Sequence, residues 1–148
     1  MDVFEKFNST GPAGSGVVKK PLSTSYYGLP VEIETSATIV HTFSKGVFEE
    51  VYLWASNIDA GDVNLTMSYD SGFSGADQII IPVSGQSGLT LVYPGLPGTS
   101  DGNQTNILYC KAGSSSKISV SGFIVRHFPL NSPLNNNNKS YYNRDITR

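Results

Sequence analysis

Hydrophobic and polar residues alternate along much of the chain, with the period of two that a half-buried β-strand requires. In "DVNLTMSYD", Val63, Leu65, Met67 and Tyr69 point one way, and the polar residues that separate and follow them point the other. We expect a strand here with one buried face and one solvated face.

The run "EEVYLWASN" alternates in the same way. Val51, Leu53 and Ala55 share one face, and Tyr52 and Trp54 share the other. The connector "NIDAG", which joins this run to the next, has the length and turn chemistry of a β-hairpin. The two runs are therefore predicted to pair as neighbouring strands.

Five further runs complete the pattern. "VEIETSATIVHTF" is strand-like with a break in its middle, and Pro82 in "DQIIIPV" indicates a strand end or a sheet edge. "SGLTLVYPG", "NQTNILYCKA" and "KISVSGFIVRHF" follow, and Gly122 in the last marks a bulge or a close approach of two backbones. Turn-forming clusters separate the runs, and none has helical periodicity. Seven or eight strands predict an all-β, antiparallel β-sandwich, with jelly-roll and immunoglobulin-like connectivities both open.

The two ends of the chain lack this pattern. Residues 1–30 are rich in glycine and proline, and residues 129–148 contain a run of four asparagines. We expect an extended N-terminal arm (1–30), a β-sandwich (31–128) and an Asn-rich C-terminal arm (129–148). Aromatic and charged residues in such arms suit an interface with a partner, although simple disorder is the alternative. The predicted interface residues are Phe4, Phe7, Tyr26, Tyr27, Tyr141, Tyr142 and Arg144.

Charge is distributed unevenly along the 148 residues. Residues 31–128 carry four cations against nine carboxylates, whereas residues 1–30 and 129–148 are weakly basic. An acidic body argues against nucleic-acid binding. No apolar run approaches the ~20 residues that cross a bilayer, so we expect no membrane contact. No secretory signal is recognisable, and Cys110 is the only cysteine, so we expect folding without disulfides in a reducing cytoplasm.

Residues that could carry chemistry are few. Gly11 and Gly16 have the spacing of a phosphate-binding loop, but Val17 stands where that loop needs a lysine. His41, His127 and Cys110 lack the spacing of a metal site and are best explained as strand residues.

The carboxylates lead to the same conclusion. Glu49 and Glu50 are adjacent in a strand, so their side chains point to opposite faces. Asp70 and Asp77 bracket a glycine-rich loop that has the carboxylates to wrap calcium, but EF-hand spacing is absent and we do not expect a calcium site. We expect no enzyme activity, no metal and no cofactor.

The phrases "FEEVYLWASN", "GLTLVYPGLPG" and "KISVSGFIVRHF" resemble small virion structural proteins of tailed bacteriophages, especially marine and cyanobacterial ones, of the head decoration (cement) class. The resemblance covers roughly residues 28–128 and excludes both arms. It implies a β-sandwich on the exterior of an icosahedral head, where it binds the major capsid protein and stabilises contacts between its subunits. It also implies a homo-oligomer on the shell and no catalytic residues.

Two alternatives belong to other classes of function. Tyr52 and Trp54 on a solvated strand face could stack on sugar rings, as in a carbohydrate-binding module of a tail or fibre adhesin. A jelly-roll subunit that itself builds a shell is the third possibility.

Overall fold

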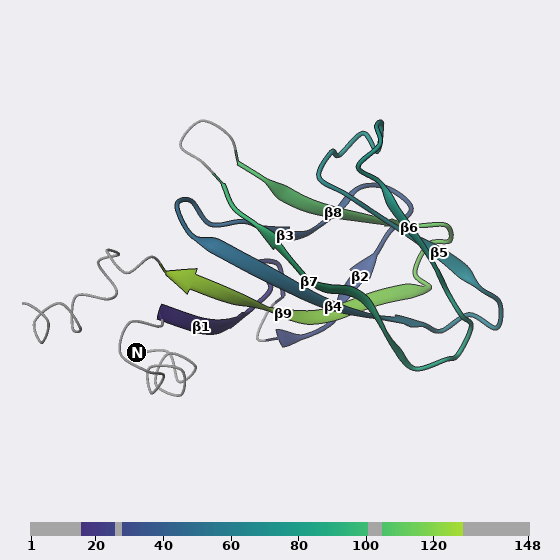
Figure 1. Ribbon diagram of the computed structural model, residues 1–148. Helices are drawn as coiled ribbons and strands as arrows, with labels where there is room; N and C mark the ends of the chain where they lie inside the picture. Colours follow the sequence, from purple (N-terminus) through teal and green to yellow (C-terminus); the bar gives the residue numbers. More distant parts are fainter. Residues whose placement is uncertain (1–15, 26–27, 101–104, 129–148) are drawn as a thin grey trace, which may run out of the picture.

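The computed structural model describes residues 16–25, 28–100 and 105–128. Within these ranges the chain forms nine β-strands and no α-helix, arranged as two antiparallel sheets that pack face to face (Figure 1). The predicted antiparallel β-sandwich is confirmed. The strands are β1 (Gly16–Pro21), β2 (Val31–Ile33), β3 (Thr38–Thr42), β4 (Phe48–Asn57), β5 (Val63–Ser68), β6 (Ile79–Val83), β7 (Leu89–Gly98), β8 (Ile107–Ala112) and β9 (Ile118–Phe128).

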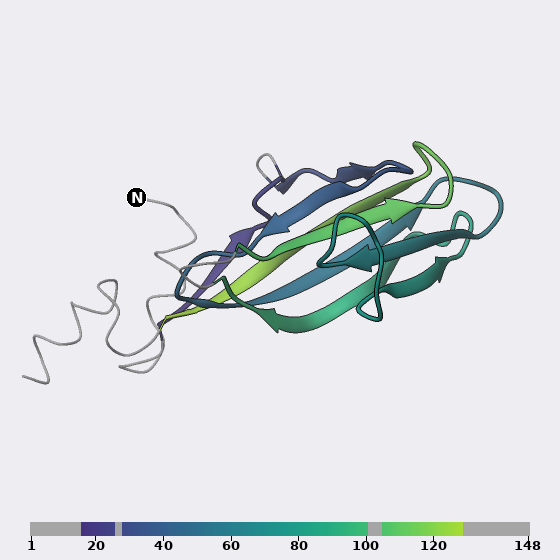
Figure 2. The same cartoon turned by 90° about the horizontal axis from the view of Figure 1, so that it is seen from above.

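We call the two layers sheet A and sheet B. Sheet A has the order β1-β9-β4-β7, and β2 pairs with the same edge of β9 as β1 does; sheet B has the order β3-β8-β5-β6. Seen from above, β1, β2 and β3 lie on one side of the sandwich, and β6 and β7 lie on the other (Figure 2). The predicted break in "VEIETSATIVHTF" is confirmed, since β2 and β3 belong to different sheets.

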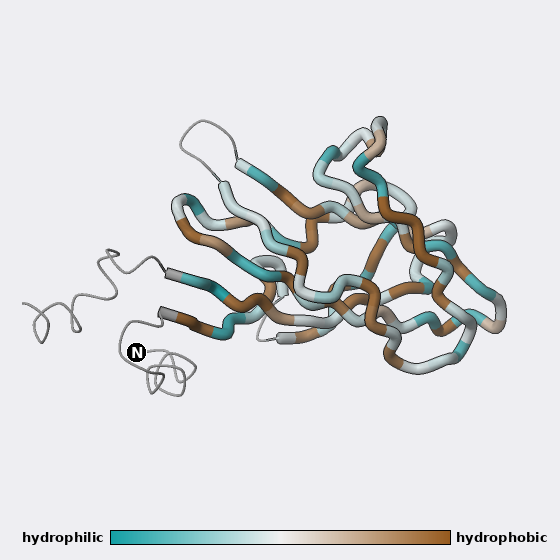
Figure 3. Tube along the Cα trace, in the orientation of Figure 1, coloured by the Kyte–Doolittle hydropathy of each residue, from teal (hydrophilic) through white to brown (hydrophobic). Residues whose placement is uncertain are grey.

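The inward side chains of both sheets form one hydrophobic core. Hydrophobic stretches recur along the strands of each layer (Figure 3), and burying one aliphatic side chain contributes about 1.5–3 kcal/mol. The predicted inward positions of β4 and the inward positions Val63, Leu65 and Met67 of β5 are confirmed. Side chains with no measurable exposure include Ile33, Val40, Val51, Leu53, Ala55, Leu65, Met67, Val83 and Val120.

The predicted hairpin between β4 and β5 is wrong. β4 pairs with β7 and β9 in sheet A, whereas β5 pairs with β6 and β8 in sheet B. Residues 58–62 cross between the sheets, and Asn57 Nδ2 holds this crossing by donating to the carbonyl oxygens of Gly61 and Val83. Because packed sheets lie only about 10 Å apart, a short segment can span them, and its turn chemistry is the same as that of a hairpin.

The sandwich begins earlier than the predicted boundary at residue 31. Strand β1 pairs with β9 along its whole length, and Leu22, which follows it, is buried in the core. β1 is an edge strand, where a terminal proline such as Pro21 is tolerated because no ladder hydrogen bond is lost. The glycines and prolines of this segment are therefore compatible with an edge strand. Only residues 1–15 are still assigned to the N-terminal arm, and that assignment comes from the sequence alone.

The outward face of β5 is solvated only in part: Asn64 is exposed as predicted, but Thr66 and Ser68 are buried. The segment between β5 and β6 folds back over this face. Its Phe73 is itself buried and its ring lies 4.4 Å from Lys111 Nζ, which projects from the outer face of β8. Asp77 accepts a hydrogen bond from Ser68 Oγ. The loop thus acts as a cover for part of sheet B.

Strands β6 and β7, which form the edges of the two sheets on one side of the sandwich, are irregular. Pro82 lies in β6 at the edge of sheet B, which confirms the edge predicted from it. In β7 the pairing with β4 shifts at two points, so Gly95 and Val92 are extra residues relative to the partner strand. Such prolines and bulges prevent further strands from adding to a sheet.

Candidate binding face

The outer face of sheet A is built first by the alternation of β4. Val51, Leu53 and Ala55 are buried, and Tyr52 and Trp54 between them are only partly buried, as predicted. No other strand of the described chain lies above this face. Its aromatic side chains are therefore available from outside the sandwich.

Strand β9 adds a third ring. Phe123 pairs with Tyr52 across the sheet, and the two rings stack with centroids 5.1 Å apart and planes at 21°. Trp54 lies beside the same ring, at 5.7 Å and 34°. Contacts of this kind stabilise by about 0.5–1.5 kcal/mol beyond burial. The three rings form one rigid cluster across two strands.

The cluster extends to both outer strands of the sheet. Lys19 Nζ on β1 lies 4.2 Å from the centroid of Phe123, which is a cation–π distance. On the opposite side, a Cβ atom on Gly95 of β7 would come within 2.5 Å of the Tyr52 ring, so Tyr52 packs directly against that glycine. The row Lys19–Phe123–Tyr52–Gly95 thus crosses sheet A from β1 to β7. We call these residues, with Trp54, the aromatic face.

Gly122 permits the close pairing beneath this face. It stands opposite Leu53, and a Cβ atom there would lie 2.0 Å from the backbone oxygen of Tyr52. Because that contact is with backbone, no side chain could move aside to relieve it. The predicted close approach at Gly122 is confirmed, without a register shift between β4 and β9 at this point.

Apolar and polar side chains surround the rings. Leu91, which pairs with Trp54, is 50% exposed, and Phe48 at the start of β4 is 57% exposed. Glu50 lies 3.4 Å from both the Tyr52 hydroxyl and His127 Nε2. The face therefore has an aromatic and apolar centre with a polar margin, an arrangement that is common at protein–protein interfaces.

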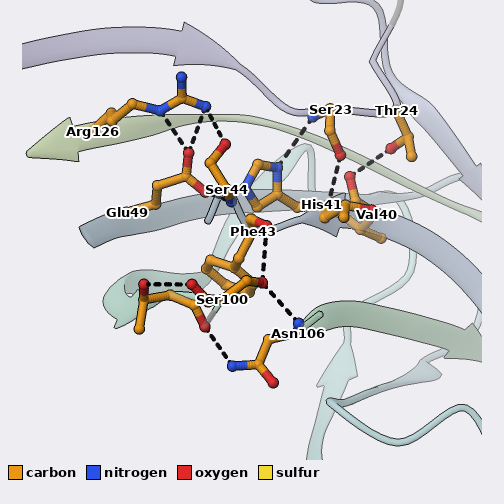
Figure 4. Close-up of polar contacts among 12 residues, drawn as sticks. Ser23, Thr24, Val40, His41, Phe43, Ser44, Glu49, Ser100, Asn106 and Arg126 are labelled. Carbon is orange, nitrogen blue, oxygen red and sulfur yellow. Dashed lines mark hydrogen bonds and ion pairs between the residues drawn. The ribbon is translucent and has the colours of Figure 1, made fainter. Parts of the chain in front are cut away.

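A separate polar cluster lies inside the sandwich (Figure 4). Glu49 of β4 is buried; it accepts hydrogen bonds from Arg126 Nε at 2.7 Å, from the backbone N–H of Ser44 at 2.9 Å and from His41 Nε2 at 2.9 Å. The backbone N–H of Ser23 donates to His41 Nδ1, so the proton of this imidazole resides on Nε2. The cluster joins β3 of sheet B to β4 and β9 of sheet A.

The electrostatics of this cluster suit a structural role. Burial raises the pKa of Glu49, but the hydrogen bonds from His41, Ser44 and Arg126 outweigh it and lower the pKa to about 2. All of its contacts stabilise the ionised carboxylate, which is therefore a poor proton donor or acceptor near neutral pH. Glu50 points to the opposite face, as predicted.

The remaining reactive residues are also held in structural roles. Burial raises the pKa of the Cys110 thiol to about 12, so this cysteine does not form a reactive thiolate. The Asp70 carboxylate accepts hydrogen bonds from the backbone N–H of Gly72 and from both the backbone and the hydroxyl of Ser74, which lower its pKa. In the described ranges no group of three or more His, Cys, Asp or Glu residues is placed to hold a metal ion.

The predicted interface residues lie outside the described residues: Phe4, Phe7, Tyr26, Tyr27, Tyr141, Tyr142 and Arg144. The structure nevertheless shows where the two terminal segments join the sandwich. Gly16 pairs with Phe128, so both segments are attached at neighbouring points of sheet A. The sequence did identify Tyr52 and Trp54, but the parts played by Phe123, Lys19 and Gly95 depend on strand pairing, which no local pattern reveals.

Comparison with family models, characterised proteins and solved structures finds no match for this chain. Among the described residues no helix is long and apolar enough to cross a membrane.

Proposed function

We propose that this chain is a non-enzymatic decoration protein of a tailed-phage head, which binds the major capsid protein through the aromatic face of sheet A. In this role it resides on the head exterior and stabilises contacts between neighbouring shell subunits. The strand phrases that resemble head decoration proteins support the proposal, as does the composition of the outer face.

The observation that carries the proposal is the row of rings on an uncovered sheet face. Tyr52, Trp54 and Phe123 are held rigid by stacking on one another, so little side-chain entropy is lost when a partner covers them. Tyrosine and tryptophan are enriched among the residues that dominate protein–protein affinity. Lys19 beside the rings adds a cation that suits an acidic surface on the partner.

The connectivity supports a viral context at the level of fold analogy. Eight strands, β2 to β9, form two four-stranded layers, and six of their seven connections pass from one sheet to the other. We interpret this order as a jelly roll, an architecture common in viral capsid proteins and in lectins. Because folds host many functions, the site rather than the fold must decide between such roles.

The terminal segments add a multivalent element to the proposal. They join the sandwich at the paired residues Gly16 and Phe128, at one end of the sheet that carries the aromatic face. Segments 1–15 and 129–148 could therefore contact the same shell as the sandwich. Linking several weak contacts raises the overall affinity without any single strong one.

A co-sedimentation experiment tests the proposal. Full-length protein is mixed with heads of the encoding phage that lack it, and the bound fraction is measured against the double variant Trp54→Ala/Phe123→Ala. The matched control is Tyr109→Ala, a half-buried tyrosine on the outer face of sheet B. We expect the double variant to lose at least about tenfold in affinity, since hot-spot residues contribute about 2 kcal/mol or more. Undiminished binding of the double variant, or an equal loss in the control, would refute the assignment.

Carbohydrate binding is the second candidate, because Tyr52 and Trp54 do lie on an outer face. The ring geometry argues against it. Phe123 is held between Tyr52 and Lys19, and Tyr52 is held between Phe123 and Gly95, so these ring faces are already occupied. Trp54 is the only tryptophan, so a shift of its fluorescence on addition of host glycans would favour the carbohydrate candidate instead.

A further inference from the structure

One long stretch of the chain carries no charge. From Gln78 to Ser100 there is no Asp, Glu, Lys, Arg or His, although residues 31–128 as a whole carry an excess of carboxylates. This stretch contains both β6 and β7. These are the edge strands of sheet B and sheet A, and they lie on the same side of the sandwich.

The same stretch contributes five of the ten exposed large hydrophobic side chains in the described part of the chain. They are Ile79 at 37%, Ile80 at 59%, Leu89 at 66%, Leu91 at 50% and Leu96 at 41% exposure. Figure 3 shows the hydrophobic stretch along β6. We call these five residues the apolar flank.

The pairing of β6 with β5 and of β7 with β4 shows that the apolar flank extends across the whole side of the sandwich formed by β6 and β7. Leu91 shares the outer face of sheet A with Trp54, and Ile80 shares the outer face of sheet B with Thr66. Leu96 pairs with the buried Val51 and so turns toward the opening between the sheets. The flank therefore continues from one outer face to the other.

Backbone pairing is not how this side could bind a partner. Pro82 in β6 and Pro94 and Pro97 in β7 lack a backbone N–H, and β7 is bulged at Val92 and Gly95. A partner would have to pack on the side chains. The exposed apolar side chains can therefore pack against a partner. The prolines and bulges prevent further strands from adding to these edges, which would lead to aggregation.

We propose that the apolar flank binds a second copy of this chain, in a two-fold symmetric contact of β6 and β7 against the same strands of the other molecule. Such a contact brings identical patches together, so a patch with a net charge would repel its copy. The flank is the long charge-free part of an otherwise acidic body, which removes that repulsion.

The size of the flank fits this occupant. β7 has ten residues, hence a length of about 33 Å, and the two sheets lie about 10 Å apart. With the side chains that project beyond both sheets, the side offers several hundred square ångströms. This is below the ~800 Å² that a standard interface buries on each partner and falls in the range of weak interfaces, so the flank suits a weak, concentration-dependent dimer.

Sedimentation velocity of the full-length protein, without phage heads, tests this inference independently of shell binding. Over ~1–100 μM, a range that covers modest dimer affinities, we expect concentration-dependent dimers. The double variant Ile80→Glu/Leu96→Glu should raise the dissociation constant at least about tenfold, because each copy then brings negative charges to the contact. The control Leu29→Glu/Ile39→Glu changes residues of matched exposure, 58% and 41%, that lie outside β6 and β7, and should dimerise normally.

Three results would overturn the inference: a wild-type protein that stays monomeric, flank variants that dimerise as well as wild type, and a control that loses dimerisation equally. Hydrogen exchange of the wild type provides a readout that does not depend on the variants folding. Amides of β6 and β7 should exchange more slowly in concentrated than in dilute solution. Concentration-dependent protection confined to other strands would contradict the assignment.

Discussion

The two outer faces of the sandwich use the same contact in different ways. On each face a lysine lies over a phenylalanine ring: Lys111 over Phe73 on sheet B, and Lys19 over Phe123 on sheet A. On sheet B the ring comes from a loop that folds back over the strands. On sheet A the ring belongs to β9 itself, and no other strand of the described chain lies above it.

Under the proposed function, this difference separates stability from binding. Phe73 is 8% exposed and belongs to the loop over Thr66 and Ser68, so its burial contributes to folding. Phe123 is half-buried, and the part of its ring that stays exposed is open to a partner. Mutations on the two faces should therefore separate the effects on folding from the effects on binding.

The largest expected effect concerns the cluster that holds both sheets together. Glu49→Gln removes the charge that pairs with Arg126 inside the sandwich, and should cost about 3–4 kcal/mol in the free energy of unfolding at pH 7. Urea unfolding measures this change. If the loss is below about 1 kcal/mol, Glu49 does not join the sheets in the way described.

The pH dependence of stability in wild type and Glu49→Gln tests the lowered pKa of Glu49. The pKa of Glu49 falls from 4.5 to about 2 on folding, so the unfolded chain takes up the proton first as pH decreases. The stability that the ionised carboxylate contributes is complete above about pH 4.5 and is lost as pH falls toward 2. The difference between wild type and Glu49→Gln should narrow over this window. A constant difference down to pH 2 would contradict the assigned pKa.

The next effect compares the two rings directly. Phe73→Ala should cost about 2–3 kcal/mol in unfolding free energy, and Phe123→Ala about 1–2 kcal/mol, because Phe73 is more deeply buried. Binding to phage heads should rank in the opposite order, with Phe123→Ala impaired and Phe73→Ala intact. The contrast between the faces fails if one variant is the more severe in both assays.

A smaller effect is expected from the two lysines. Lys19→Gln and Lys111→Gln should each lower stability by less than about 1 kcal/mol, the usual limit for a cation–π contact at the surface. Only Lys19→Gln should weaken head binding, and the loss should diminish at high salt because charge contacts are screened. Salt titration of co-sedimentation measures this. Equal binding losses from both lysines would show that sheet A is not the favoured face.

The smallest effect is a control on sheet B. Asn64 is exposed at the end of β5, and Asn64→Ala should change stability by less than about 0.5 kcal/mol. Leu65→Ala, one residue further into the core, should cost about 2–5 kcal/mol. Similar midpoints for the two variants in urea would show that the facing of β5 has been assigned incorrectly.

Most of the architecture could be predicted because strand periodicity is local. Alternation along β4 identified its inward and outward residues, and Pro82 and Gly122 marked an edge and a close approach. The errors arose where distant segments meet. Thr66 and Ser68 looked solvated because nothing in their own strand signals that Phe73 and Asp77 return to cover them.

The candidate site was predictable only in part, for a related reason. Tyr52 and Trp54 share a face by alternation alone, whereas their contact with Phe123 depends on the register of β4 against β9. In the cluster of His41, Glu49 and Arg126, the hydrogen-bonded pair Glu49 and Arg126 is 77 positions apart. Single polar residues inside strands gave no sign of this pairing.

Electron cryomicroscopy of phage heads decorated with the full-length protein tests the central claim most directly, because it shows which face of the sandwich meets the shell. We expect sheet A to lie against the major capsid protein, with Trp54 and Phe123 buried in the contact and the Phe73 loop of sheet B pointing away from the shell. Density in which sheet B faces the shell, or heads that carry no bound sandwich, would contradict it.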